Sequence, residues 1–272
     1  MSLPDLAPLV VVLVLLELAA GALVVTWLGD VLGDAQRGFA GTTTLICLAI
    51  LAGDLALLAV LPDPSRLLHQ PVDAAQFSSM IHWSIALAVA MLLYAIFCGV
   101  GTDIARRVVG AGAVLCACVA LARAAATFGS PLFGGWAGAV AILPAALLAG
   151  STLAGMLLGH WYLIAPDLSF RPLRRAVALI FLAVGVDVAA IVTGLVVADA
   201  SSRQTVLNDP AFWLLVVGSG VVVTGAVNGL TYYFARIRAN QPATAMLYAL
   251  IISALMGLVP SHLLYFITRV PV

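Results

Sequence analysis

The feature that most constrains this chain is a succession of apolar runs, each long enough to cross a lipid bilayer. Short loops containing Pro, Asp and Arg separate the runs, and no loop is long enough for a separate water-soluble domain. Because a helix needs about 20 apolar residues to cross the hydrocarbon core, each run predicts one transmembrane helix. The eight predicted spans are Leu6–Leu28, Phe39–Leu61, Phe77–Val100, Val108–Phe128, Trp136–Ile164, Ala176–Ala198, Ala211–Ala235 and Ala243–Thr268.

The composition agrees with a lipid environment. Hydrophobic residues make up 64% of the 272 positions, charged residues make up 9%, and lysine does not occur. So few charges cannot cover the surface of a water-soluble domain of this size. The runs are too long for barrel strands and do not alternate between apolar and polar residues. We therefore expect an all-α, polytopic membrane bundle of eight transmembrane helices, forming one domain over residues 1–272. The formal net charge of zero gives no indication of nucleic-acid binding.

The distribution of arginine predicts the orientation of the bundle. Eight arginines lie in the loops after the first, third, fifth and seventh spans, and three lie on the opposite side. Because cytoplasmic loops carry an excess of Arg and Lys, we expect both termini outside. The expected location is the bacterial cytoplasmic (inner) membrane. The segment before the first span has no Arg or Lys, so we expect a retained span and no cleaved signal peptide.

Ionisable side chains inside the spans are rare, and they are the first candidates for function. His82 in the third span and His262 in the eighth lie at similar depths below the outer edge, judged by the rise per residue of a helix. Arg123 in the fourth span and Asp54 in the second lie near the same level. This shared layer predicts a site or a mutually satisfying network.

The leading functional interpretation is an integral membrane electron-transfer component. Two imidazoles from different helices suit axial ligation of a b-type haem, so we expect His82 and His262 to face each other. Arg123 would pair with a haem propionate or a quinone oxygen, and Asp54 would transfer a proton. The quinone would bind near the external face, and partner subunits would carry any further redox centres.

Simpler interpretations of the same residues remain open. Asp54 and Arg123 could form an ion pair, and each histidine could bond a neighbouring carbonyl or hydroxyl group. His69, in the loop after the second span, could join His82 and His262 in a metal site. His160 ends the fifth span beside an aromatic pair, and it is either a cofactor contact or an interfacial anchor.

A second set of polar residues supports an alternative function. Glu17 in the first span and Asp187 in the sixth lie near mid-depth, and Asn228 belongs to a polar face of the seventh. Carboxylates at this depth with a polar helix face are typical of a proton or cation path. They predict a proton-coupled transporter or channel. A structural subunit, whose polar residues only bond helix to helix, is the third interpretation.

Neither catalytic motifs nor packing motifs distinguish between these three functional interpretations. The chain has no phosphate-binding loop, dinucleotide fingerprint, Gly-x-Ser-x-Gly or His-Glu-x-x-His motif, so whether it is an enzyme stays open. Small residues recur at four-residue spacing in two spans. We expect these faces to pack inside the bundle, with homodimerisation as the alternative. They are Ser151, Gly155 and Gly159 in the fifth span and Gly225 and Gly229 in the seventh.

Overall fold

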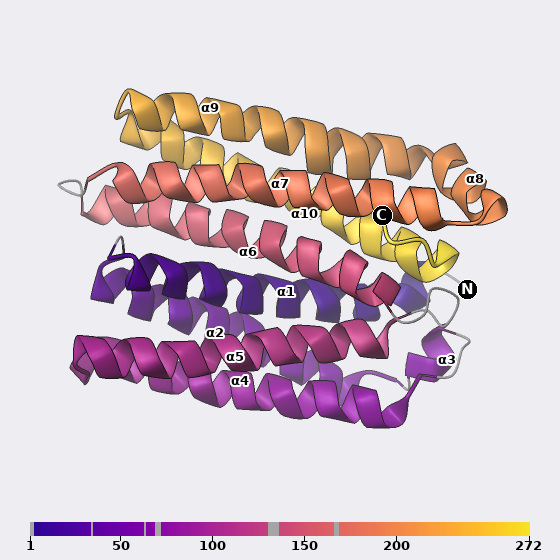
Figure 1. Cartoon of the computed structure of the whole chain (residues 1–272), viewed down its shortest axis with the longest axis horizontal. Coiled ribbons are helices and arrows are strands. Elements are labelled where there is room, and N and C mark those ends of the chain that lie inside the picture. Colours follow the sequence, from indigo (N-terminus) through magenta and orange to yellow (C-terminus); the bar gives the residue numbers. More distant parts are fainter. Residues whose placement is uncertain (1–2, 34, 63, 69–71, 130–135, 166–168) are drawn as a thin grey trace.

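Figure 1 shows the computed structural model of the chain, in which the described residues are 3–33, 35–62, 64–68, 72–129, 136–165 and 169–272. Within these ranges the secondary structure is helical and contains no strand. Eight helical segments of the same ranges are long and apolar enough to cross a membrane. The predicted all-α membrane bundle is therefore confirmed.

Each predicted span corresponds to one long helical segment. In chain order these are α1 (Leu3–Val31), α2 (Arg37–Val60), α4 (Ala74–Val100), α5 (Asp103–Thr127), α6 (Trp136–Ile164), α7 (Arg171–Val197), the π-helix η2 (Phe212–Val223) continued by α9 (Thr224–Arg236), and α10 (Asn240–Thr268). Two short helices lie in the connections, α3 (Pro64–Leu68) and α8 (Ala200–Asn208).

Several helices begin before their apolar run does. The run in α5 starts at Val108, whereas the helix starts at Asp103. The Thr102 hydroxyl accepts a hydrogen bond from the Ala105 backbone N–H at 3.2 Å and caps this polar first turn. Asp73 caps α4 in the same way by accepting from two backbone N–H groups. Capping residues therefore set these ends, and the hydrophobic boundary lies inside the helix.

The spans form two four-helix groups that meet along α1 and α6. Helices α1, α2, α4 and α5 form the first group, and α6, α7, the seventh span and α10 form the second (Figure 1). Helices α1 and α6 have the largest buried share among the eight spans of the described chain. Helix α1 also contacts α10 across the boundary. Side chains on α1, α6 and α10 can therefore meet at the centre of the bundle.

Two glycine contacts bring these helices together at the backbone. A Cβ atom on Gly21 of α1 would lie 2.0 Å from the Ala146 carbonyl oxygen of α6, and Gly150 of α6 faces Gly21 equally closely. A Cβ atom on Gly257 of α10 would lie 2.3 Å from the Cα atom of Gly220 in η2. Only glycine permits such approaches, so these positions determine how closely the helices pack.

Of the two small-residue faces predicted to pack inside the bundle, one does so and the other does not. Gly155 and Gly159 of α6 face Leu247 of α10, where a Cβ atom would lie 3.4 Å and 2.7 Å from its side chain. Packing of this face inside the bundle is confirmed. Gly225 and Gly229 of α9 have open space where a Cβ atom would be, so the expected packing is wrong for the seventh span within this chain. Residue spacing defines a helix face but does not determine which face turns inward.

The bundle has two chemically distinct ends. The first, which we call the arginine-rich end, contains the α1–α2, α4–α5, α6–α7 and α9–α10 connections. The second, which we call the terminal end, contains the start of α1 and the end of α10 (Figure 1).

Candidate functional site

A buried carboxylate–imidazole pair lies where α1 meets α10. Glu17 Oε2 and His262 Nε2 are 2.9 Å apart, and both side chains are 0% exposed. Glu17 is the only glutamate of the chain. A pair removed from water in this way needs a good hydrogen bond to offset its desolvation, and the 2.9 Å separation provides one.

Each side chain of the pair also has a second polar atom that takes no part in this contact. Glu17 Oε1 and His262 Nδ1 are buried and have no hydrogen-bond partner among the described residues. A neutral imidazole carries its hydrogen on one nitrogen and accepts on the other. When Nε2–H donates to Glu17, the Nδ1 lone pair is left to accept a proton. The pair can therefore gain and lose a proton without breaking its own hydrogen bond.

A third ionisable group belongs to the same region. Asp187 of α7 is half-buried and interacts electrostatically with both His262 and Glu17. Three helices, α1, α7 and α10, therefore contribute one titratable group each. The sequence indicated Glu17 and Asp187 as a set and placed His262 in another, whereas the structure associates all three.

Local features of the two helices position the pair. Pro260 lies two residues before His262, and because proline has no N–H, it interrupts the backbone hydrogen bonding of α10 there. Tyr265, one turn beyond His262, donates its hydroxyl to the Phe128 carbonyl oxygen at 2.7 Å and anchors α10 to the end of α5. On α1, the Gly21 contact with α6 lies one turn from Glu17.

The expected pairing of His82 with His262 is not formed. His82 is exposed on α4, and its Nδ1 bonds the Ser78 carbonyl oxygen of the same helix at 2.7 Å. Helix α4 packs against α2 and α5, whereas α10 packs against α6, the seventh span and α1. Figure 1 accordingly shows α4 and α10 in different helix groups. Equal depth did not make these residues neighbours, because all eight spans pass through the same layer.

Among the residues that the structure describes, His82, His160 and His262 do not form a metal site. No group of three or more His, Cys, Asp or Glu side chains within the described ranges is placed to hold a metal ion. His69, the third residue of the predicted metal site, lies outside the described residues. His160 is exposed at the end of α6, and its Nδ1 lies 3.2 Å from the Tyr248 hydroxyl. This position agrees with an interfacial anchor.

Asp54 and Arg123 do not form the ion pair that was the simpler interpretation of these two residues. Arg123 is half-buried and donates to Gln76 Oε1 at 3.2 Å. Asp54 is fully buried on α2, and neither carboxyl oxygen has a hydrogen-bond partner in the described part of the chain. An unpaired buried carboxyl group costs free energy, so Asp54 is a second candidate functional group. It belongs to the first helix group, together with Arg123.

Asn228 connects two helices of the second group. Its Nδ2 donates to the Val177 carbonyl oxygen of α7 at 3.0 Å, and its Oδ1 has no partner among the residues described. Asp187 lies ten residues further along α7, which corresponds to about 15 Å of helix. Asn228 therefore lies well away from the Glu17–His262 pair and links α9 to α7.

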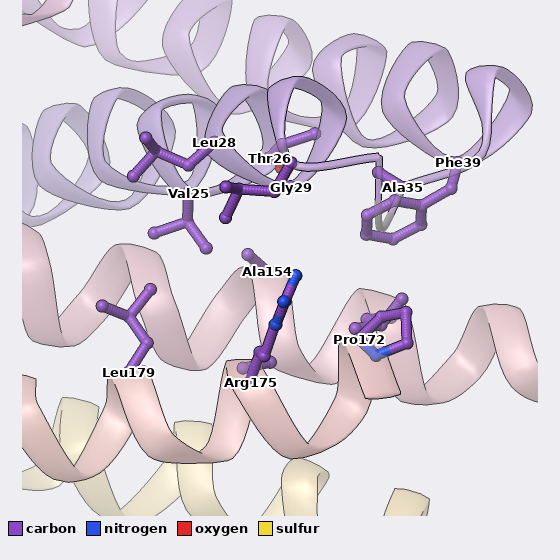
Figure 2. A pocket seen from close by; sticks show the side chains of 13 residues that line it. Val25, Thr26, Leu28, Gly29, Ala35, Phe39, Ala154, Pro172, Arg175 and Leu179 are labelled. Carbon is purple, nitrogen blue, oxygen red and sulfur yellow. The ribbon is translucent and has the colours of Figure 1, made fainter. Parts of the chain in front are cut away.

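Sequence reasoning missed a cavity near the arginine-rich end. The cavity has a volume of about 290 Å³ and lies between the end of α1, the end of α6 and the start of α7 (Figure 2). Its lining is apolar except for Thr26 and Arg175. A cavity has no local sequence pattern, because it depends on how side chains from separate helices fail to fill the space between them.

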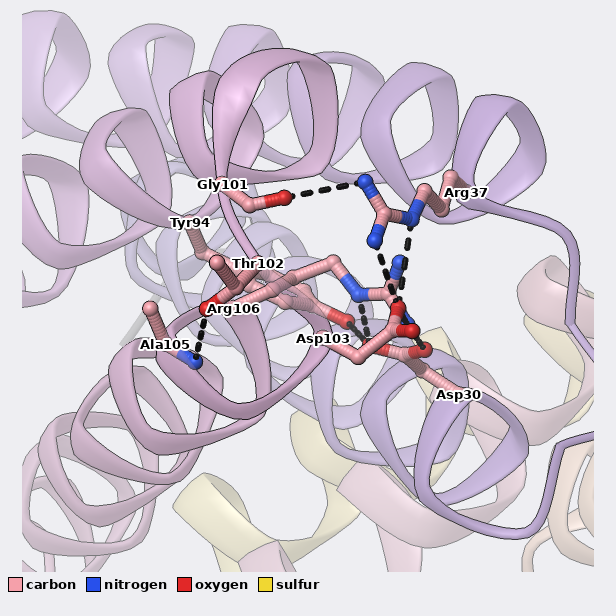
Figure 3. Close-up of polar contacts among 8 residues, drawn as sticks. All are labelled: Asp30, Arg37, Tyr94, Gly101, Thr102, Asp103, Ala105 and Arg106. Carbon is pink, nitrogen blue, oxygen red and sulfur yellow. Dashed lines mark hydrogen bonds and ion pairs between the residues drawn. The ribbon is translucent and has the colours of Figure 1, made fainter.

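Sequence reasoning also missed a buried charge cluster at the same end (Figure 3). Asp30 of α1 accepts from Arg106 of α5 at 2.6 Å and 2.9 Å and from the Tyr94 hydroxyl of α4 at 2.9 Å. All three side chains are buried. The more exposed Arg37 pairs with Asp103 at 2.7 Å beside them. A bidentate pair with a third donor is a strong link, and it ties α1, α4 and α5 together.

Comparisons with known proteins add no family to these observations. Searches against protein-family models and against curated protein sequences find no match. The helices and their buried polar groups therefore define the class on their own. The protein is an all-α integral membrane protein whose two helix groups share a buried carboxylate–imidazole pair.

Proposed function

We propose that this protein is a proton-coupled membrane transporter, with Glu17 and His262 as its proton-exchanging pair. The observation that carries the proposal is the buried 2.9 Å contact between Glu17 Oε2 and His262 Nε2. The second polar atom of each side chain, Glu17 Oε1 and His262 Nδ1, has no hydrogen-bond partner among the described residues. Ionisable groups are expensive inside a membrane and are retained there chiefly for function. The position of the pair between the two helix groups supports a role in coupling.

The proposed mechanism uses proton binding to change an attraction between helices. A proton held at His262 Nδ1 makes the imidazole cationic and strengthens its interaction with the Glu17 carboxylate. A proton on Glu17 removes that attraction. Asp187 exchanges protons with the pair. Because Glu17 and His262 belong to different helix groups, their protonation state biases how the groups pack against each other, as proton-driven alternating access requires.

The proposed orientation follows the arginine distribution. We place the arginine-rich end in the cytoplasm and the termini outside, in a bacterial cytoplasmic membrane. On this orientation His262 lies nearer the outer surface, since it is six residues from the end of α10.

The first test measures the protonation of Glu17 directly. Because the chain has a single glutamate, ¹³C-labelled glutamate isolates the infrared bands of this one carboxyl group. We expect the labelled bands to report reversible protonation when the pH around the lipid vesicles is varied. Glu17→Gln should remove them, and His262→Gln should shift the pH at which they change. Bands that do not respond to pH under any condition in which the protein stays folded would contradict the proposal.

The second test measures proton flux in vesicles loaded with a pH-sensitive dye, under an imposed membrane potential. Glu17→Gln, His262→Gln and Asp187→Asn should reduce the flux to that of protein-free vesicles. The control is Asp199→Asn, which alters a carboxylate outside the spans. Hydrogen bonds from the backbone and side chain of Ser202 and from the Ser201 backbone lower the pKa of Asp199, which caps α8. Asparagine caps helices equally well, so this control should behave like the parent.

Electron transfer is the alternative function. The observation that favours it is the buried His262 Nδ1, which could ligate a haem whose other ligand comes from a partner subunit. A reduced-minus-oxidised absorption spectrum tests this alternative. A b-type band that His262→Gln abolishes would favour a haem-binding, quinone-linked component over transport. If the Glu17, His262 and Asp187 variants all behave like the parent, a structural subunit is favoured.

A further inference from the structure

The cavity near the arginine-rich end is separate from the Glu17–His262 pair. Thr26, which lines it, follows Glu17 by nine residues on α1, a distance of about 14 Å along the helix. Much of its apolar wall comes from Leu28 of α1, Leu32 directly after α1, Leu158 of α6 and Leu179 of α7. The cavity lies beside the first turns of α7, at the arginine-rich end of the bundle.

Thr26 and Arg175 are the two polar side chains that line this otherwise apolar cavity. Thr26 is 2% exposed, and its hydroxyl has no hydrogen-bond partner among the described residues. Arg175 rises from α7, and its guanidinium points toward Thr26 and Gly29 of α1 (Figure 2). A buried hydroxyl without a partner is unusual, because native structures pair nearly all such groups. Together these side chains offer hydrogen-bond donors of two kinds at one edge of an apolar space.

We propose that this cavity binds an anionic amphiphile, that is, an acyl chain carrying a carboxylate or phosphate group. The anionic group bonds Arg175 and the Thr26 hydroxyl, and the acyl chain lies along the apolar wall. Arginine suits this role because its planar guanidinium matches carboxylate and phosphate oxygens in pairs. The volume of about 290 Å³ is near the lower end for small-molecule sites. This inference goes beyond the proposed function and does not depend on it.

Equilibrium binding to the purified protein in a neutral detergent tests the charge requirement. The probes are radiolabelled palmitate, a monoacyl phosphate of equal chain length, and uncharged hexadecanol. Arg175→Gln should weaken binding of both anions by about tenfold or more, and Thr26→Val by about fivefold. The matched control is Arg174→Gln, which removes an exposed arginine next in sequence that does not line the cavity. This control should leave the affinities unchanged.

A second variant tests the apolar part of the site. A Cβ atom on Gly29 would meet only the Ala35 Cβ atom, at 3.5 Å, so Gly29→Leu can fill the cavity while the helices stay in place. Gly29→Leu should block both anions, whereas Gly112→Leu, which extends into open space on α5, should not.

Three outcomes would overturn the proposal. They are equal losses in the Arg174 and Arg175 variants, hexadecanol binding as tightly as palmitate, and unchanged binding to Gly29→Leu. Each of them would reduce the anion binding to general attraction at a basic surface or to detergent-like adsorption. The preference between palmitate and the monoacyl phosphate then distinguishes the two sources of the ligand, a free fatty acid and a phospholipid.

Discussion

Glu17 Oε2 and His262 Nε2 lie 2.9 Å apart, although 245 residues separate these two amino acids in the chain. The contact joins α1 of the first helix group to α10 of the second. Both side chains are fully buried, so the hydrogen bond between them offsets part of the cost of removing them from water. Loss of this contact should therefore change the stability of the bundle as a whole.

Removing the carboxylate should destabilise the bundle more than neutralising it. Glu17→Ala leaves His262 Nε2 buried without a partner, so the free energy of unfolding should fall by about 1–3 kcal/mol. Glu17→Gln keeps an acceptor in the same place and should cost less. Denaturant-induced unfolding in detergent micelles measures both changes. Equal losses for the Ala and Gln variants would show that the hydrogen bond does not stabilise the fold.

The close approach of α1 to α6 should depend on glycine. Gly21→Leu places a side chain where the Ala146 carbonyl oxygen lies 2.0 Å from the added Cβ atom, so the helices must separate. We expect an overpacking loss of about 1–3 kcal/mol or more, and lower proton flux because Glu17 lies one turn away. Gly112→Ala is the control, because a Cβ atom there meets open space. It should be neutral or slightly stabilising, since alanine favours helices.

The buried Asp30–Arg106 pair should contribute more to the stability of the fold than the exposed Arg37–Asp103 pair. Arg106→Gln leaves Asp30 buried without its cation, and the free energy of unfolding should fall by about 3–5 kcal/mol. Arg37→Gln breaks a pair that water already surrounds, and it should change stability little. Thermal unfolding of the two variants under one set of conditions makes the comparison. Similar midpoints for both would contradict the structural role of the Asp30–Arg106 contact.

Replacing Asp54 should raise the free energy of unfolding, whereas replacing Glu17 should lower it. Neither carboxyl oxygen of Asp54 has a hydrogen-bond partner in the described part of the chain, although the side chain is fully buried. Asp54→Leu removes an unsatisfied polar group and adds apolar volume, so stability should rise by about 1–3 kcal/mol. The same unfolding assay measures it. A clear loss of stability would show that the Asp54 carboxyl group has a bound partner, such as an ion or a ligand.

The fold was predictable because it follows from local hydrophobicity. A run such as Trp136–Ile164 is long enough to cross the bilayer, and its backbone must form a helix there to satisfy its own hydrogen bonds. The predicted bounds for this span agree with α6. Helix ends were less predictable where a polar first turn precedes the apolar run, as at Asp103 in α5, because a capping side chain decides them.

The sequence indicated which residues belong to the candidate site, but it did not predict which of them contact each other. Glu17, Asp187 and His262 each stood out as polar groups in apolar spans, and the structure brings these three into one region. His82 stood out equally, yet it lies on the outside of α4 and bonds its own helix. Sequence position gives the depth of a residue in the membrane, whereas contact also requires that two helices be neighbours and that the right faces meet.

The sequence by itself determined that this protein crosses the membrane eight times as helices, and which of its few ionisable side chains must lie at depth. Hydrophobic run length is a property of each segment alone, so no knowledge of other segments was needed. Only the tertiary structure decided that Glu17 meets His262, that Asp30 meets Arg106, and that Gly225 and Gly229 face outward. The reason is physical: helix rotation and neighbour choice depend on side-chain packing between segments, and glycine contacts such as Gly21–Gly150 select one arrangement among many of similar hydrophobicity.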